Sequence, residues 1–161
     1  MNKRNQTSVP NAVATETTLL LTRLREVERR IGLRLLGWSL FSVIAGAILV
    51  TGFAGPFAAG VGVQAIAWGV IDAVIAGLGL RGSNRGSADA DLRRARLTKL
   101  LGINTLLDIL YISAGVALWL IFPGNRFISG NGFGVIIQGA FLFGFDLIHM
   151  TAIRLRRSEM R

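Results

Sequence analysis

The sequence predicts an all-α, polytopic membrane protein, a four-helix bundle made of two transmembrane hairpins. Hydrophobic residues make up 52% of the 161 residues and charged residues only 17%, against about 25% charge in an ordinary soluble domain. The apolar residues form two tracts, each long enough for two spans of about 20 residues. Turn-forming residues break each tract once, at Gly55-Pro56 and at Pro123-Gly124-Asn125-Arg126.

The elements follow in order from these breaks. Residues 1–18 lack periodicity and are expected to be disordered. Apolar residues recur at helical spacing over residues 19–34, which predicts an amphipathic helix on the membrane surface. Spans are then expected at about 35–54, 57–80, 100–122 and 131–152, with 35–80 as the first hairpin, 81–99 as a basic loop or helix, 100–152 as the second hairpin and 153–161 as a basic tail.

The basic residues predict the orientation. All but one of the 18 lysines and arginines lie before the first span, in the central segment or after the last span, and Arg126 is the exception. The positive-inside rule therefore places both termini and residues 81–99 in the cytoplasm, and a multi-pass protein of the plasma membrane is expected. The expected partner is a bilayer with anionic headgroups. Candidate headgroup contacts are Arg29, Arg30, Arg93, Arg94, Arg154 and Arg156.

The composition argues against several other functions. The chain has no cysteine and one histidine, so no metal and no cofactor such as haem is expected within one subunit. It has no Ser/His/Asp constellation and no P-loop, so enzyme activity is not expected. Nucleic acid is not an expected partner, because no aromatic residues interleave with the basic ones. The first 30 residues also lack the features of a removable signal peptide.

Three aspartates in the predicted spans fall at nearly the same depth. Asp72, Asp108 and Asp146 each lie eight or nine residues from the basic residue that ends their helix, roughly 12 to 14 Å along a helix. An ionisable group inside a membrane is costly and marks a candidate functional site. Because burial and like charge both disfavour ionisation, at least one of the three is expected to be protonated at neutral pH, unless the layer holds a cation or water.

The third span carries a polar stripe that includes one of these aspartates. Asn104, Asp108, Tyr111 and Gly115 share one face of a helix. Polar side chains in spans turn toward the bundle interior or a wet cavity. This face is therefore expected to look inward, with Asp72 and Asp146 converging on it.

Two glutamines and the histidine complete the candidates for ion or solute binding. Gln64 and Gln138 are expected to form a second layer, about 12 Å farther toward the outside than the aspartates. His149 follows Asp146 at i+3. It either pairs with this aspartate and relays a proton or reaches the lipid headgroups.

These residues allow two functions. The first is transport of a small solute, a proton or another cation through a site that opens toward the cytoplasm. The second is a non-transporting membrane subunit or scaffold that binds lipid or a protein partner. In that case the polar residues only link helices, through hydrogen bonds worth about 0.6 kcal/mol each on average.

Self-similarity indicates an internal duplication. Arg34-Leu-Leu-Gly is echoed by Lys99-Leu-Leu-Gly at an offset of 65, and the Gln64 to Asp72 spacing recurs in the fourth span at an offset of 74. The nine-residue difference is interpreted as a longer outer loop in the second hairpin. Both halves start on the same side, so a parallel repeat about an axis along the membrane normal is expected.

Small residues predict a close helix contact on the second span. Ala65, Gly69, Ala73 and Gly77 form an i+4 ladder of the small-xxx-small type, which lets helix backbones approach. The ladder is expected either to pack inside the monomer or to form the seam of a homodimer.

Three strings carry a resemblance to a known family. They are Asn104-Thr-Leu-Leu-Asp-Ile-Leu-Tyr, Gln138-Gly-Ala-Phe-Leu-Phe-Gly-Phe-Asp and Trp68-Gly-Val-Ile-Asp. Over residues 33–152 the chain resembles a family of small, uncharacterised four-helix bacterial membrane proteins classed as a domain of unknown function. The resemblance supports the fold and implies no activity. It also implies that a neutral amide often stands where this chain has Asp72, which argues against a mechanism that needs three acids.

Overall fold

The described residues form four helices, α1 (Ser8–Gly52), α2 (Pro56–Ser83), α3 (Ala90–Ile121) and α4 (Arg126–Ser158). The structure is a computed structural model that describes residues 8–83 and 89–158, with side chains described for 15, 17–82 and 89–153. All four helices are long and apolar enough to cross a membrane. The protein is therefore all-helical, with the composition of a multi-pass membrane protein.

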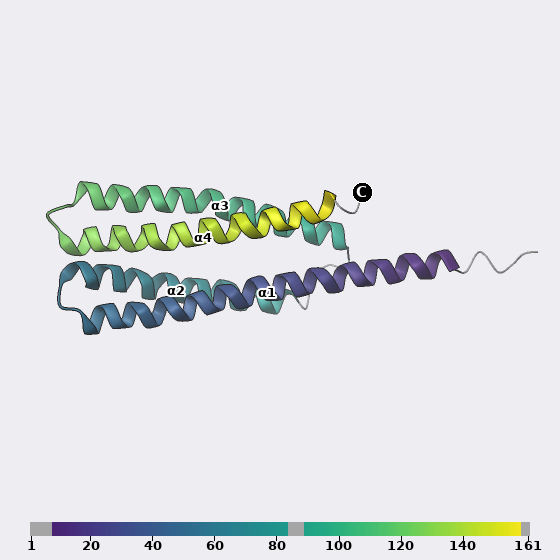
Figure 1. Ribbon diagram of the computed structural model, residues 1–161, viewed down its shortest axis with the longest axis horizontal. Helices are drawn as coiled ribbons and strands as arrows, with labels where there is room; N and C mark the ends of the chain where they lie inside the picture. The colour runs from purple at the N-terminus through teal and green to yellow at the C-terminus, as the bar shows by residue number, and fades with distance from the viewer. Residues whose placement is uncertain (1–7, 84–88, 159–161) are drawn as a thin grey trace, which may run out of the picture.

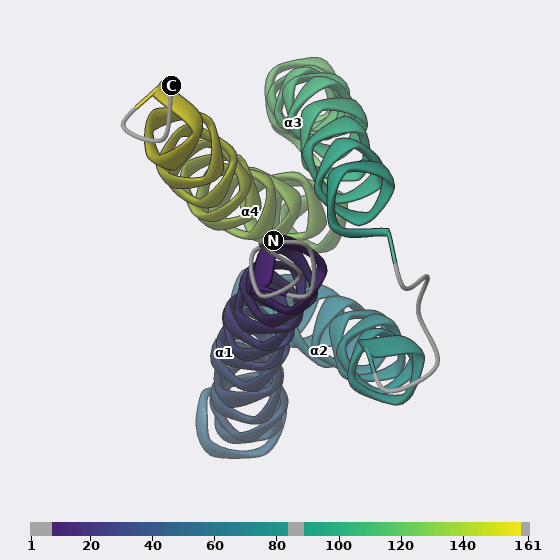
Figure 2. The ribbon, with the colours of Figure 1, turned by 90° about the vertical axis from the view of Figure 1, so that its right-hand side faces the viewer.

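The helices lie side by side in one bundle (Figure 1). Both hairpin connections lie at one end, which we call the hairpin end. The start of α1, the junction of α2 with α3 and the end of α4 lie toward the other, which we call the terminal end. Along the bundle α1 packs on α2, α3 packs on α4, and α2 packs on α4. Seen from the terminal end, α2 and α3 lie apart on the same side of the bundle (Figure 2).

The boundaries at the terminal end differ from the predicted ones. Residues 8–52 form one continuous helix, so the predicted amphipathic segment 19–34 is not separate from the first span, and part of the predicted disordered tail is helical. Residues 1–7 lie outside the described part. Of the predicted basic segment 81–99, residues 81–83 end α2, residues 84–88 lie outside the described part, and residues 90–99 form the first turns of α3. Asp89 caps this helix by accepting hydrogen bonds from the backbone N–H groups of Asp91 and Leu92.

The second hairpin connection is shorter than predicted. The fourth helix starts at Arg126 rather than near residue 131, and the side chain of Asn125 accepts a hydrogen bond from the backbone N–H of Ile128 at 3.1 Å. The segment Ser129-Gly-Asn-Gly has the composition of a loop. Here it is helical, because its glycines let α4 approach both neighbouring helices.

Equivalent glycine contacts close both hairpins. A Cβ atom added at Gly46 would lie 2.6 Å from the backbone oxygen of Gly62, and one added at Gly115 would lie 2.7 Å from that of Gly132. Real Cβ atoms essentially never come within 3.0 Å of such an atom. The backbones of α1 and α2, and of α3 and α4, therefore meet at points that only glycine allows.

The contact between α2 and α4 is reciprocal. Gly60 lies against the backbone of Phe127, and Gly130 lies against the backbone of Phe57. A two-fold rotation that exchanges the two hairpins would place Gly60 and Phe127 where Gly130 and Phe57 lie. Contacts related in this way are typical of a two-fold interface. These contacts align Phe57-x-x-Gly-x-Gly with Phe127-x-x-Gly-x-Gly, and this register differs from the one predicted from the Gln and Asp spacing. The duplication itself stays a prediction.

The predicted ladder on α2 packs inside the monomer at Gly69. A Cβ there would lie 2.8 Å from the backbone oxygen of Ser39 in α1. Ala65 is buried and Ala73 half-buried. A Cβ at Gly77 would meet nothing within 4 Å, so Gly77 makes no close contact within the monomer, and a contact across a homodimer seam stays a prediction. The close contact of this ladder therefore belongs to its part nearer the hairpin end.

Candidate functional site

Three helices each bring one aspartate into the bundle interior. Asp72 from α2, Asp108 from α3 and Asp146 from α4 are 2%, 3% and 6% exposed. Asp108 lies close enough to both other carboxyls for their charges to interact, and Asp72 lies close enough to Asp146. The structure thus brings together the three aspartates that their depth in the sequence singled out, and we call them the acidic layer.

Two oxygens of the acidic layer lack a donor. Oδ2 of Asp72 and Oδ2 of Asp108 are buried without a hydrogen-bond partner. A buried carboxylate oxygen of this kind is costly unless the carboxyl is protonated or meets a cation. The part of the chain that the structure describes has no group of three or more His, Cys, Asp or Glu residues that could hold a metal ion. A proton or a cation at the acidic layer would supply the missing partner.

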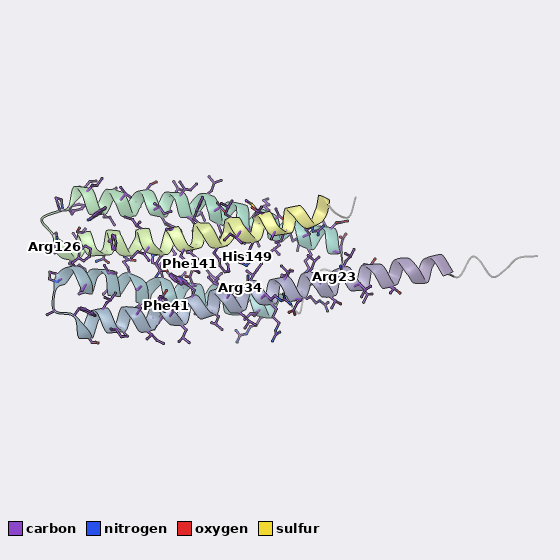
Figure 3. The ribbon with its side chains drawn as sticks, viewed as in Figure 1. Arg23, Arg34, Phe41, Arg126, Phe141 and His149 are labelled. Carbon is purple, nitrogen blue, oxygen red and sulfur yellow. The ribbon has the colours of Figure 1, made fainter. Side chains whose placement is uncertain are left out.

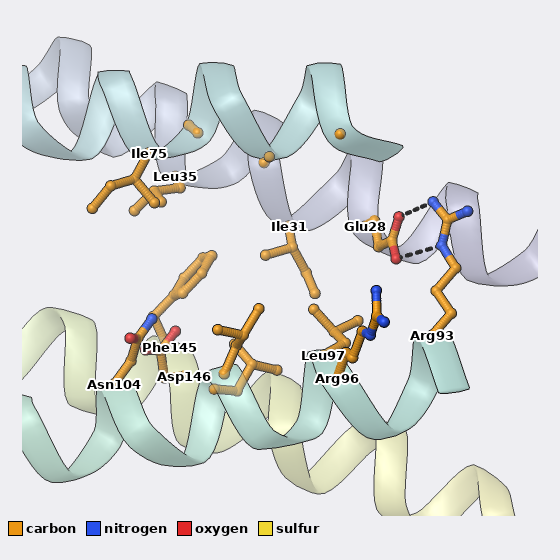
Figure 4. A pocket seen from close by; sticks show the side chains of 16 residues that line it. Glu28, Ile31, Leu35, Ile75, Arg93, Arg96, Leu97, Asn104, Phe145 and Asp146 are labelled. Carbon is orange, nitrogen blue, oxygen red and sulfur yellow. Dashed lines mark hydrogen bonds and ion pairs between the residues drawn. The ribbon is translucent and has the colours of Figure 1, made fainter. Parts of the chain in front are cut away.

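A cavity of about 320 Å³ leads from the terminal end to the acidic layer. All four helices line it, and most of its wall is aliphatic (Figure 4). Asn104 and Asp146 lie side by side at one end. Arg96 and the pair of Glu28 with Arg93 lie toward the other end. The phenyl ring of Phe145 is part of the wall beside Asp146.

The pair of Glu28 and Arg93 ties α1 to α3 at the mouth of this cavity. Nε of Arg93 donates to Oε1 of Glu28 at 2.7 Å, and Nη2 donates to Oε2, so the contact is bidentate. Arg93 is only 6% exposed. Its guanidinium faces the half-buried carboxylate of Glu28, so the structure gives no support to the predicted lipid-headgroup contact of Arg93.

The other predicted headgroup arginines differ in their surroundings. Arg29 and Arg30 are exposed, and Arg30 pairs with Glu26 one turn earlier. Arg94 is half-buried. Arg154 and Arg156 lie in α4, and their side chains fall outside the described part.

The two predicted glutamines link helices instead of lining the cavity. Gln138, 3% exposed, accepts a hydrogen bond from Nε1 of Trp38 at 2.8 Å and donates one to Oγ of Ser42 at 3.2 Å. Gln64 donates to the side-chain oxygen of Asn131 at 3.1 Å. Each glutamine is thus held by its own partners on a neighbouring helix. The structure does not bring the two together as one continuous polar track.

Aromatic contacts fill the bundle beyond the acidic layer. Trp38 stacks on Phe141, with the ring centroids 3.6 Å apart. Trp68 meets Tyr111 edge-on at 4.9 Å. Tyr111 remains 36% exposed, so this part of the stripe on α3 does not look fully inward as predicted. The reason is that α3 packs mainly along α4, and Tyr111 reaches α2 through this ring pair.

His149 is held by two partners, and neither is Asp146. Its Nδ1 lies 2.6 Å from the backbone oxygen of Phe145. A carbonyl only accepts, so Nδ1 carries the hydrogen, and Nε2 accepts from Nη1 of Arg34 at 3.3 Å. The two side chains face each other between α1 and α4 (Figure 3). The predicted pairing of His149 with Asp146 is therefore absent from the described contacts.

A family comparison covers the acidic layer. A family of unknown function, DUF6992, matches residues 34–147. The chain belongs to this family. The matched segment contains all three aspartates together with Asn104, whereas Glu28 and His149 lie outside it. No curated protein and no solved structure matches the chain.

Proposed function

We propose that this protein is a small membrane transporter that binds a proton or another monovalent cation at the acidic layer and moves a solute through the cavity beside it. One observation carries the proposal. The cavity of about 320 Å³ ends at Asp146, and the neighbouring Asp72 and Asp108 each keep a buried oxygen without a partner. Intramembrane carboxylates that line a pathway are the usual proton and ion sites of transporters.

The packing of the bundle supports access from one side only. The glycine contacts and the aromatic pairs close the bundle between the acidic layer and the hairpin end. The cavity lies on the opposite side of the acidic layer. The positive-inside rule supports a cytoplasmic terminal end, and the resemblance to bacterial membrane proteins supports the inner membrane of a bacterium as the location. The site then faces the cytoplasm in this conformation.

This orientation has a direct test. Ala95→Cys at the terminal end and Gly124→Cys in the second hairpin connection introduce single cysteines into a chain that has none. Both positions are exposed. In intact cells an impermeant thiol reagent should label only Gly124→Cys, and lysis should be needed to label Ala95→Cys. Labelling of both positions from outside would contradict the four-span topology.

The transport function is tested in liposomes with a pH-sensitive dye inside. The purified protein should dissipate an imposed pH gradient faster than protein-free liposomes, in Na⁺ or K⁺ buffer. Asp108→Asn and Asp146→Asn should each slow this toward the protein-free rate, because each removes a carboxylate that holds the ion. Asp91→Asn, which removes an exposed acid from α3, should retain the wild-type rate. Unchanged rates in folded aspartate variants would contradict the proposal.

A non-transporting scaffold is the second candidate, and a specific observation favours it. Hydrogen bonds between or within helices hold the side chains of Gln64, Gln138 and His149. If all polar residues of the spans act in this way, the aspartate variants should change stability without changing ion flux. The liposome measurement therefore decides between the two.

We also infer that the two hairpins are a parallel repeat. The matched contacts of Gly46 with Gly62 and of Gly115 with Gly132, and the reciprocal contact of α2 with α4, support this relation. The repeat then accounts for an acidic layer with Asp72 from the first hairpin and Asp108 and Asp146 from the second.

A further inference from the structure

We propose that the cavity binds a lipophilic organic cation, with its ammonium group between the carboxylate of Asp146 and the ring of Phe145. This inference rests on the proposed function, because it names the class of solute that the same site takes. It follows from the charge at the two ends of the cavity, from the chemistry of its wall and from its size.

The charge at the inner end selects a cation. Asp146 lies there at 6% exposure, with Asp72 and Asp108 close enough to act on it electrostatically. Their layer contains no lysine or arginine. At the mouth, Glu28 offsets the charge of Arg93. Arg96 is exposed, so solvent screens its charge far more than it screens the buried carboxylates.

The wall of the cavity selects an apolar body. Ile31, Leu35, Ile75, Leu97 and Leu101 line it between the two polar ends. Phe145 adds an aromatic ring directly before Asp146 (Figure 4). An aromatic face next to a carboxylate suits an ammonium group, including a quaternary one that has no hydrogen to donate.

The size of the cavity fits a small molecule. A volume of about 320 Å³ is at the lower end of the range for small-molecule sites, about 300 to 1,000 Å³. An inorganic cation alone would leave the aliphatic wall without a partner. An apolar molecule without charge would leave the acidic end unmatched.

The test measures binding with defined probes. Full-length protein in nanodiscs of zwitterionic lipid is titrated calorimetrically with benzyltrimethylammonium and, separately, with phenylacetate, an anion of similar size. Empty nanodiscs provide the background. We expect the cation to bind and the anion not to bind.

Two pairs of variants locate the bound cation. Asp146→Asn should weaken binding about tenfold or more by removing the partner charge, whereas Asp91→Asn should leave it unchanged. Gly79→Leu places a side chain in the cavity, since Gly79 lines it and a Cβ there meets nothing within 4 Å. This variant should abolish binding without changing any charge. Gly77→Leu is its matched control, because a Cβ at Gly77 also meets nothing within 4 Å but Gly77 does not line the cavity.

Each other result overturns the inference. Binding of phenylacetate that is lost in Arg96→Gln would identify an anionic occupant instead. Cation binding that survives Gly79→Leu would place the cation elsewhere, and no binding of either probe would exclude this solute class. The inference and the transport proposal also fail separately. Cation binding without dissipation of the pH gradient would contradict only the transport proposal. Dissipation without cation binding would contradict only the proposal that the solute is an organic cation.

Discussion

Gly130→Ala should destabilise the protein by about 3 kcal/mol or more, the upper part of the range for overpacked cores. Its Cβ would overlap the backbone oxygen of Phe57, and the next nearest atoms are also backbone. A flexible side chain could move aside, but a helix backbone cannot do so without separating α2 from α4. The measurement is thermal unfolding in detergent, followed by circular dichroism.

The chain offers matched controls for this prediction. Gly144→Ala makes the same change in the same helix, where a Cβ meets nothing within 4 Å. It should unfold within about 0.5 kcal/mol of the wild type. Gly60→Ala should behave like Gly130→Ala, because the contact is reciprocal. Equal unfolding temperatures for Gly130→Ala and Gly144→Ala would contradict the close packing of α2 on α4.

The number of helices and their apolar character follow from the sequence because they depend on local composition. The start of α4 does not. Ser129-Gly-Asn-Gly has the composition of a turn, yet Gly130 and Gly132 serve contacts with α2 and α3. Local propensity gave way to tertiary packing at this point. The sequence did carry a signal for this contact. Phe57, Gly60 and Gly62 have the same spacing as Phe127, Gly130 and Gly132, but the alignment on Gln and Asp used a different register.

The acidic layer was predictable for a similar reason. Depth in a membrane can be counted along a helix, so Asp72, Asp108 and Asp146 could be placed in one layer from their distance to a basic boundary. Which side chain meets which across helices cannot be counted in this way. The pair of Glu28 with Arg93 joins residues 65 positions apart, and neither residue stands out from its basic or acidic neighbours in the sequence.

The hydrogen-bonded polar residues show the same limit. Gln138 was singled out correctly as polar within a span, but its partners Trp38 and Ser42 were not. Asn131 was hidden in the segment that resembles a loop. His149 meets Arg34 because α1 and α4 approach each other there, a contact that sequence spacing alone does not determine. The cavity depends on all four helices at once and had no counterpart in the sequence.

The central claim is that the three aspartates form one coupled site. Interacting acids lose their protons as a group, so the titration of each depends on the others. Asp108 interacts with both Asp72 and Asp146. Removing it should therefore change the titration of both remaining carboxyls, although neither residue has been altered.

Infrared titration of the protonated carboxyl band tests this claim most directly. The account predicts that in Asp108→Asn the band of the remaining buried carboxyls moves by about one pH unit or more relative to the wild type. Asp72→Asn and Asp146→Asn should also move the band of their neighbours, and Asp91→Asn should leave it in place. The contradicting result is that each variant loses only the part of the band that belongs to the replaced aspartate, while the other two carboxyls titrate as in the wild type. The three acids would then be independent.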